Sequence, residues 1–473
     1  KRLETRRKIQ AQPSDSTKEM LKAPRLKRFV MAYKNSDGKE VYGNQGTSRS
    51  KNEKYIYNEN GIVVIKSSDD KLTIPKRLNY NVSYFINDLV SQVDFNYINY
   101  SYQPFTGGGG PIYLNPGFNL FFQVGMNDLM EDYRIVGGVR LNLSLINNEY
   151  IFSYANLKKR LDREIVLHRN TLERPFGYTI TRVHTNEIFY MLKWPFNEAL
   201  SLRGTGMLRN DMYVTLATDQ ITLETPTVYN FWAGVKAELV FDNTRNLGIN
   251  LMSGTRYKIF AEYYQLIENS SNNLIVLGFD IRNYQKIHRN FIWANRIAGS
   301  TSFGSDKLIY YMGGVDNWLF PKFNMDTPID YSQNYAYQTL ATNMRGFNQN
   351  IRNGNSFVVI NSELRFPVFQ YFSKTPISSG FLRSFQLIGF GDIGTAWTGL
   401  SPYSTENSLF TKYITSGPMN ISVEVQKEPI VGGFGFGARA TIMGYFVRGD
   451  ISWGVDDYNV RKPVYYLSLS LDF

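Results

Sequence analysis

The last ten residues, Val464-Tyr465-Tyr466-Leu467-Ser468-Leu469-Ser470-Leu471-Asp472-Phe473, contain the pattern that decides the fold class. Apolar and mostly polar side chains alternate along this stretch. Successive side chains of a β-strand point to opposite faces, so the alternation predicts a strand with one apolar and one polar face. The predicted apolar face ends on an aromatic residue and consists of Tyr465, Leu467, Leu469, Leu471 and Phe473.

The same two-residue period runs through the chain from about Phe118 onward. Many of the repeating segments reach ten or more residues, the length that a tilted membrane-spanning strand needs, whereas soluble strands average about five or six. An even number of strands suits a closed barrel without a free edge. Closure requires the first strand, expected near Phe118–Met126, to pair with the last. The seam and C-terminal signal are therefore expected at Tyr465, Leu467, Leu469, Leu471 and Phe473. We therefore predict an all-β fold, a closed antiparallel transmembrane β-barrel of about sixteen strands. The segments lie near 118–126, 133–145, 148–158, 161–172, 182–194, 197–212, 227–243, 255–266, 273–286, 290–303, 306–314, 356–367, 384–398, 430–442, 444–456 and 463–473.

Composition agrees with strands rather than helices as the spanning elements. The mean hydropathy is −0.31, and no stretch reaches the 18–20 consecutive apolar residues that a spanning helix needs. Aromatic residues make up 15% of the chain, with 33 Tyr and 32 Phe. Aromatic girdles at the two lipid interfaces of a barrel would use such a surplus. The predicted location is the bacterial outer membrane, in contact with its lipid.

Residue types needed for catalysis or cofactor binding are scarce or unpatterned. The chain has no cysteine, which excludes disulfides and thiolate chemistry, and only three histidines, His168, His184 and His288, with no metal-ligand spacing. We expect each histidine to be an ordinary barrel or loop residue. The sequence predicts no enzyme activity, no cofactor, no metal and no small-molecule substrate.

The N-terminal part differs from the rest in charge and texture. Residues 1–80 carry 19 Lys and Arg against 9 Asp and Glu, a net charge of +10 out of +11 for the whole chain. The favoured interpretation is a solvated linker, with contact to anionic lipid or an acidic partner as the alternative. No nucleic-acid-binding motif accompanies the charge. The charged opening lacks an apolar signal-peptide core, so we expect residues 1–473 to be the C-terminal part of a longer polypeptide.

These patterns divide the chain into three predicted segments. Residues 1–77 form a polar, basic linker or periplasmic leader, in which only 55–66 could pair as a hairpin. Residues 78–117 form an aromatic lead-in, and residues 118–473 form the barrel. A connection of about forty residues separates the strands predicted at 306–314 and 356–367. Long loops inside a compact domain are usually functional.

That long connection and the strands after it carry a set of motifs. The loop ends in Met344-Arg345-Gly346-Phe347, and Ser362-Glu363-Leu364-Arg365 follows. Further motifs are Phe390-Gly391-Asp392-Ile393-Gly394, Gly433-Phe434-Gly435-Phe436-Gly437-Ala438-Arg439 and Arg448-Gly449-Asp450. Their order and spacing resemble the bacterial surface antigen family, the BamA/TamA superfamily of outer-membrane assembly and translocation barrels. The resemblance is good over about residues 230–473 and extends to 118–230 only by texture.

The resemblance implies a long extracellular loop that folds back into the barrel. By it, Arg345 is the loop tip and Asp392 its partner on the barrel wall, with Glu363 a second candidate acceptor. Gly346 would allow a tight backbone turn, and Phe347 would pack against the wall. A guanidinium inside a barrel needs an anion, and its fork matches a carboxylate. Arg345, Gly346 and Phe347 are therefore expected to lock the loop.

The function implied by this resemblance is insertion, assembly or translocation of proteins at the outer membrane, together with other outer-membrane or periplasmic proteins. Such members carry POTRA domains, and residues 1–117 show no such pattern. The lead-in and residues 126–134 resemble a subgroup in which a TolB-like propeller precedes the barrel. The alternative is therefore a structural barrel that anchors a periplasmic propeller or serves as a subunit of a larger complex. A passive diffusion porin fits the strand count but not the loop motifs.

Overall fold

The structure is a computed structural model. The chain folds into two compact units, 1–80 and 81–473. Each unit is described by itself. The residues described are 31–34, 40–43, 55–57, 63–65, 82–94, 101–105, 107, 110, 112, 119–142, 147–176, 179–416, 419–424 and 426–469.

Two short antiparallel hairpins are described in the N-terminal unit. The first pairs β1 (Met31–Lys34) with β2 (Glu40–Gly43), and the second pairs β3 (Tyr55–Tyr57) with β4 (Val63–Ile65). The hairpin predicted at 55–66 is thus confirmed. The first hairpin lies in a stretch where the sequence showed no apolar period, so pattern alone did not reveal it.

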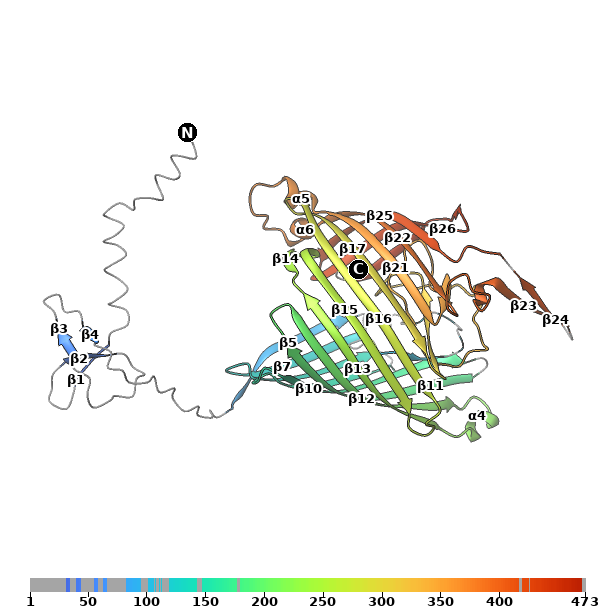
Figure 1. Ribbon diagram of the computed structural model, residues 1–473, viewed down its shortest axis with the longest axis horizontal. Helices are drawn as coiled ribbons and strands as arrows, with labels where there is room; N and C mark the ends of the chain where they lie inside the picture. Colours follow the sequence, from blue (N-terminus) through green and yellow to red (C-terminus); the bar gives the residue numbers. More distant parts are fainter. Residues whose placement is uncertain are drawn as a thin grey trace. The chain divides into compact units, whose positions relative to one another are not determined.

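The second unit is built on one large sheet in which the long strands pair antiparallel with their neighbours along the chain (Figure 1). The sheet order runs from β5 to β28, and β28 is followed again by β5. Its strands are β5 (Tyr84–Asp94), β7 (Asn119–Asp128), β8 (Tyr133–Asn142), β9 (Glu149–Asn156), β10 (Asp162–Phe176), β11 (Thr179–Pro195), β12 (Leu200–Leu216), β13 (Val228–Asp242), β14 (Arg245–Gly248), β15 (Leu251–Leu266), β16 (Asn273–His288), β17 (Phe291–Phe303), β21 (Ser356–Phe366), β22 (Gln386–Trp397), β25 (Val431–Ile442), β26 (Tyr445–Asp456), β27 (Asn459–Val460) and β28 (Val464–Leu469).

Most strands of this sheet have one apolar, exposed face and one polar, buried face. On β28, Tyr465 and Leu467 are 67% and 40% exposed, whereas Tyr466 between them is 3% exposed. On β26, every second residue is buried. The apolar residues point away from the molecule and the charged ones toward its interior, which is the reverse of a soluble sheet. The two-residue period of the sequence sets this arrangement.

The large sheet differs from the predicted barrel wall in two strands, one that was not predicted and one that was wrongly assigned to the wall. The first strand of the sheet is β5, which pairs with β7, so the sheet begins inside the segment predicted as a lead-in and not at residue 118. A bulge between Ile86 and Asp88 shifts the register of β5, and an extra residue of this kind breaks the two-residue period. The segment predicted at 306–314 is a strand but does not belong to the large sheet.

The strand found at the segment predicted as 306–314 is β18 (Lys307–Met312). It lies in a four-stranded inner sheet with β6 (Gln103–Pro104), β19 (Tyr335–Leu340) and β20 (Arg352–Gly354). Five of its six residues are buried, so both of its faces are covered. Its continuous run of apolar residues is typical of such a strand. The connection between β17 and β21 is therefore 304–355, longer than predicted.

The main core lies between the inner sheet and the inner face of the large sheet. One buried cluster joins Leu308 and Tyr310 of β18 to Trp232, Val276 and Phe357 of the large sheet. The 304–355 connection therefore packs against the inner face of the large sheet.

The remaining elements lie in connections between long strands. In Figure 1, α5 and α6 lie at one end of the strands, and α4 and the β23–β24 hairpin lie toward the other. These elements are α4 (Gln220–Glu224), α5 (Val368–Phe372), α6 (Gly380–Ser384), η1 (Ser408–Phe410), β23 (Thr411–Ser416) and β24 (Met419–Glu424). Of the helices in the described part of the chain, none is long and apolar enough to cross a membrane.

Candidate functional site

The tip of the 304–355 loop lies against the inner face of the large sheet. A two-way backbone bridge fixes its base, because Gly314 and Met344 each donate an N–H to the other's carbonyl at 3.0 and 3.1 Å. Gly346 follows with a φ of +100°, a left-handed conformation that favours glycine. The tip therefore turns sharply and directs the side chain of Arg345 at the wall.

Arg345 is 1% exposed and is held chiefly by Asp392 of β22. Its Nε and Nη2 each donate to one carboxylate oxygen of Asp392 at 2.6 Å, and its backbone N–H donates to the same carboxylate at 3.1 Å. Its guanidinium also lies 3.7 Å from the ring centre of Phe390, a cation–π contact. The structure brings together the loop arginine and the wall aspartate that the motifs suggested.

Glu363 of β21 is the anion shared by three buried arginines. Its Oε1 lies 2.5 Å from Nη1 of Arg345 and 2.7 Å from Nη2 of Arg439. Its Oε2 accepts from Nε of Arg365 at 2.9 Å. All four side chains are at most 1% exposed. Removal of this one carboxylate would leave three guanidinium groups without their common partner.

Tyr466, on the last strand β28, holds the loop tip by its backbone. Its hydroxyl accepts the N–H groups of Gly346 and Phe347, both at 2.9 Å, and donates to the carbonyl of Phe347 at 2.7 Å. The hydroxyl therefore satisfies three backbone groups of the tip. The last strand and the loop are thus directly linked.

The wall is shaped to receive this tip. A Cβ added to Gly433 of β25 would lie 1.9 Å from the carbonyl oxygen of Arg345, and one added to Gly454 of β26 would lie 2.4 Å from the ring of Phe347. Glycine is required where two backbones approach this closely. Gly433 of the glycine-rich motif of β25 therefore serves contact with the loop, a role that its sequence alone did not distinguish from easing barrel curvature.

The predicted C-terminal residues are only partly described. Tyr465 and Leu467 point outward and Leu469 is half-buried. Leu471 and Phe473 lie outside the described residues.

Three residues that sequence reasoning did not assign to the site are Arg365, Arg439 and Tyr466. Both arginines stand in the quoted motifs, and Tyr466 is the one aromatic residue on the polar face of the last strand.

A second buried polar cluster crosses the opposite part of the wall. His168 of β10 has a carboxylate oxygen 2.8 Å from each ring nitrogen, one from Glu149 and one from Glu187. Each contact of the cluster joins adjacent strands or neighbouring residues, and Tyr337 of β19 links the cluster to the inner sheet. In order, the linked residues are Arg140, Glu149, His168, Glu187, Arg209, Asp211 and Tyr337. His168, predicted to be an ordinary barrel residue, is thus part of a structural ladder.

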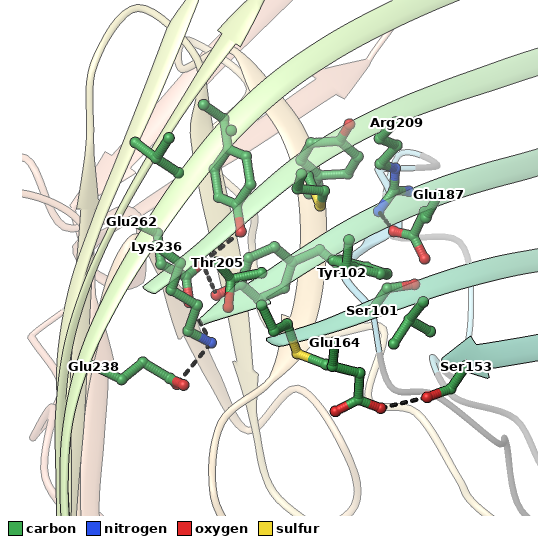
Figure 2. Close-up of a pocket in the computed structure, with 18 of the residues that line it drawn as sticks. Ser101, Tyr102, Ser153, Glu164, Glu187, Thr205, Arg209, Lys236, Glu238 and Glu262 are labelled. Atoms are coloured by element: carbon green, nitrogen blue, oxygen red, sulfur yellow. Dashed lines mark hydrogen bonds and ion pairs between the residues drawn. The ribbon is translucent and has the colours of Figure 1, made fainter. Parts of the chain in front are cut away.

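A cavity of about 470 Å³ lies beside this ladder (Figure 2). Its polar groups are paired with one another. Lys236 contacts Glu238 at 3.0 Å and Glu262 at 2.9 Å, and Glu262 also accepts from the hydroxyl of Tyr102 at 2.9 Å. Figure 2 also shows Glu164 turned toward Ser153. Among the described residues, no group of three or more acidic or histidine side chains is arranged to hold a metal ion.

No protein-family model and no curated protein matches the sequence. Among solved structures, the chain is similar to BamA from Haemophilus ducreyi lacking POTRA domains 1–3, at 10% identity and a TM-score of 0.47, over 74% of this chain and 67% of that one. It is also similar to CdiB from Acinetobacter baumannii, at 12% identity and a TM-score of 0.40, over 74% of this chain and 56% of that one. For CdiB from Escherichia coli the values are 9%, 0.42, 80% and 67%. One of these proteins, BamA, carries the name of the superfamily that the sequence motifs resemble.

Proposed function

We propose that this chain is an outer-membrane β-barrel of the BamA/TamA type that takes part in inserting, assembling or translocating proteins at the outer membrane. The observation that carries the proposal is the loop locked inside the sheet by Arg345, Asp392 and Glu363. A buried, fully paired arginine at a loop tip is a costly arrangement that needs matched partners on the wall. Such an arrangement fixes how the loop, the wall and the last strand move together.

The proposal includes a barrel closed by β28 and β5. Eighteen strand segments make up the sheet, of which β14 and β27 have four and two residues and continue their neighbours. Sixteen long strands remain, the number that the sequence suggested. Exposed apolar side chains on the outer face support a lipid environment, as on β10 with Ile165 and Leu167 at 42% and 44% exposed.

The filled interior favours a function at the barrel wall over diffusion of solutes through a central pore. The inner sheet and the loop tip pack against the wall from within, so a diffusion porin is the less fitting interpretation. In the mechanism proposed here, the seam between β28 and β5 opens sideways and exposes backbone donors and acceptors. An incoming strand could then pair with that edge, as strands do in β-augmentation.

The test is insertion of another protein. The full chain is reconstituted into liposomes, and the folding of a small, unfolded outer-membrane barrel into them is followed by gel shift. We expect folding about tenfold faster than in empty liposomes, a barrier lowered by about 1.4 kcal/mol. Liposomes that carry an unrelated closed barrel control for membrane defects. Equal rates in all three would refute insertase activity and favour the structural barrel that anchors a propeller or a larger complex.

A further inference from the structure

The edge of the last strand is occupied by a segment of the 304–355 loop. Leu319 donates its backbone N–H to the carbonyl of Leu467 at 2.9 Å, and Leu469 donates its N–H to the carbonyl of Asn317 at 3.4 Å. The side-chain amide of Asn317 also donates to the carbonyl of Leu469 at 3.2 Å. Trp318 between them forms an antiparallel bridge with Ser468. Residues 317–319 therefore pair with β28 as a short antiparallel strand would.

This edge is the one that faces the seam. The other edge of β28 pairs with β26, through Arg448 and Ser468 among others. The sheet order places β5 next after β28, on the side of β28 that does not face β26. The loop segment thus takes backbone groups that a neighbouring strand would otherwise use.

The strand beyond the seam is β5, which follows β28 in the sheet order. Side chains of β5 are exposed on both faces, with Phe85, Ile86 and Leu89 at 46%, 64% and 73%. A strand covered on one face would alternate between exposed and buried residues, as β26 does. The bulge between Ile86 and Asp88 interrupts this alternation in β5, and consecutive apolar side chains are exposed there.

The segment on β28 also fills an aromatic pocket. Trp318 is 5% exposed and packs edge-on against Tyr466, with ring centres 4.8 Å apart at 64°. Val315 and Val464 complete the contact. The hydroxyl of the same Tyr466 holds the backbone of the loop tip. Whatever occupies the pocket therefore contacts the residue that clamps the Arg345 tip.

The occupying segment is short. Pro321 follows two residues after Leu319, and proline cannot donate a ladder hydrogen bond, so the pairing cannot continue as a regular strand through that position. A longer strand could make more backbone bonds along β28 than the three residues present. A longer strand that replaced the segment would therefore gain backbone hydrogen bonds along β28.

We propose that residues 317–319 are an internal stand-in for an incoming polypeptide strand. The edge at Leu467–Leu469, with the pocket of Trp318, is then a binding site for an extended apolar segment that carries a large aromatic residue opposite Ser468. This inference rests on the proposed function and names the chemistry of its client. It also makes the loop a placeholder that the client displaces.

The test uses a peptide that copies the stand-in. The chain contains no cysteine, so Leu467→Cys provides a single thiol at the edge. The probe is a synthetic peptide with the sequence of residues 314–321 and the substitution Leu319→Cys, which places its sulfur opposite residue 467. That sulfur is supplied as a pyridyl disulfide, so the protein thiolate forms the mixed disulfide by exchange and pyridinethione leaves. We expect a mixed disulfide at least about tenfold faster with Leu467→Cys than with Ile393→Cys. Ile393 is comparably exposed at 48%, but both edges of its strand are paired.

The aromatic residue is tested in the peptide and not in the protein, so that protein folding is not at issue. A peptide with alanine in place of tryptophan is expected to react about tenfold more slowly at Leu467→Cys. Equal rates for the two peptides, or equal rates at the two protein positions, would overturn the site. Peptide capture without accelerated insertion would leave this site standing and remove the insertase function. Accelerated insertion without peptide capture would support the insertase function and remove this site.

Discussion

Glu363→Gln is expected to destabilise the folded barrel by about 3–5 kcal/mol, the usual cost of removing one partner from a buried ion pair. The substitution preserves side-chain shape but removes the only charge shared by Arg345, Arg365 and Arg439. Because these side chains are at most 1% exposed, water cannot compensate. Arg345→Ala should cost less, since Arg365 and Arg439 keep their carboxylate.

The measurement is the temperature at which the folded barrel loses its fast migration on a cold detergent gel. Glu173→Gln is the matched control, because the Glu173 pair with Arg182 is a quarter to a third exposed and such pairs contribute about 0–1 kcal/mol. Equal shifts for Glu363→Gln and Glu173→Gln would show that the three arginines do not depend on Glu363.

Gly433→Ala is expected to drive the loop tip away from the wall. Its added methyl would lie 1.9 Å from the backbone oxygen of Arg345, where no side chain can move aside. Overpacking of this kind costs about 1–3 kcal/mol, and displacement of the tip would add the loss of the Arg345–Asp392 pair. We expect cleavage of the 304–355 loop by added protease at least about tenfold faster, since 1.4 kcal/mol corresponds to a factor of ten.

The neighbouring glycine provides the control. A Cβ at Gly432, on the same strand, would meet its nearest atoms at 3.9 Å, an ordinary contact. Gly432→Ala should therefore leave protease cleavage of the loop unchanged. Cleavage at the same rate in Gly433→Ala and Gly432→Ala would contradict the close approach of loop and wall.

The long strands could be predicted from the sequence because most of them have one apolar, exposed face and one polar face. Segments such as 273–286 and 444–456 differ from β16 and β26 by at most two residues at either end. The period fails where that physical cause is absent. A bulge interrupts it in β5, and burial on both faces replaces it in β18. The prediction missed β5 and wrongly placed β18 in the wall, so the predicted number of long wall strands is unchanged.

The candidate site depended on two kinds of reasoning. The contact of Arg345 with Asp392 was accessible only through a family resemblance, because the two residues lie 47 positions apart and no local pattern joins them. The role of Tyr466 was not accessible at all. Its hydroxyl lies beside the loop tip because β28 places it there, and the pairing of residues 317–319 with the strand edge likewise follows from three-dimensional placement.

If protein insertion proceeds at the edge of β28, as we propose, a reversible lock on that edge should stop it. Leu319 and Leu467 are opposite residues of a hydrogen-bonded antiparallel pair, where Cα atoms are about 5.5 Å apart, within the range of a disulfide. The variant Leu319→Cys/Leu467→Cys is assayed in the liposome insertion experiment, oxidised and then reduced. Thr301→Cys/Ser356→Cys, which joins two neighbouring wall strands, is the control. We expect oxidation to slow client folding about tenfold in the edge variant only, and reduction to restore it. Full activity of the oxidised edge variant would show that insertion does not use the edge of β28.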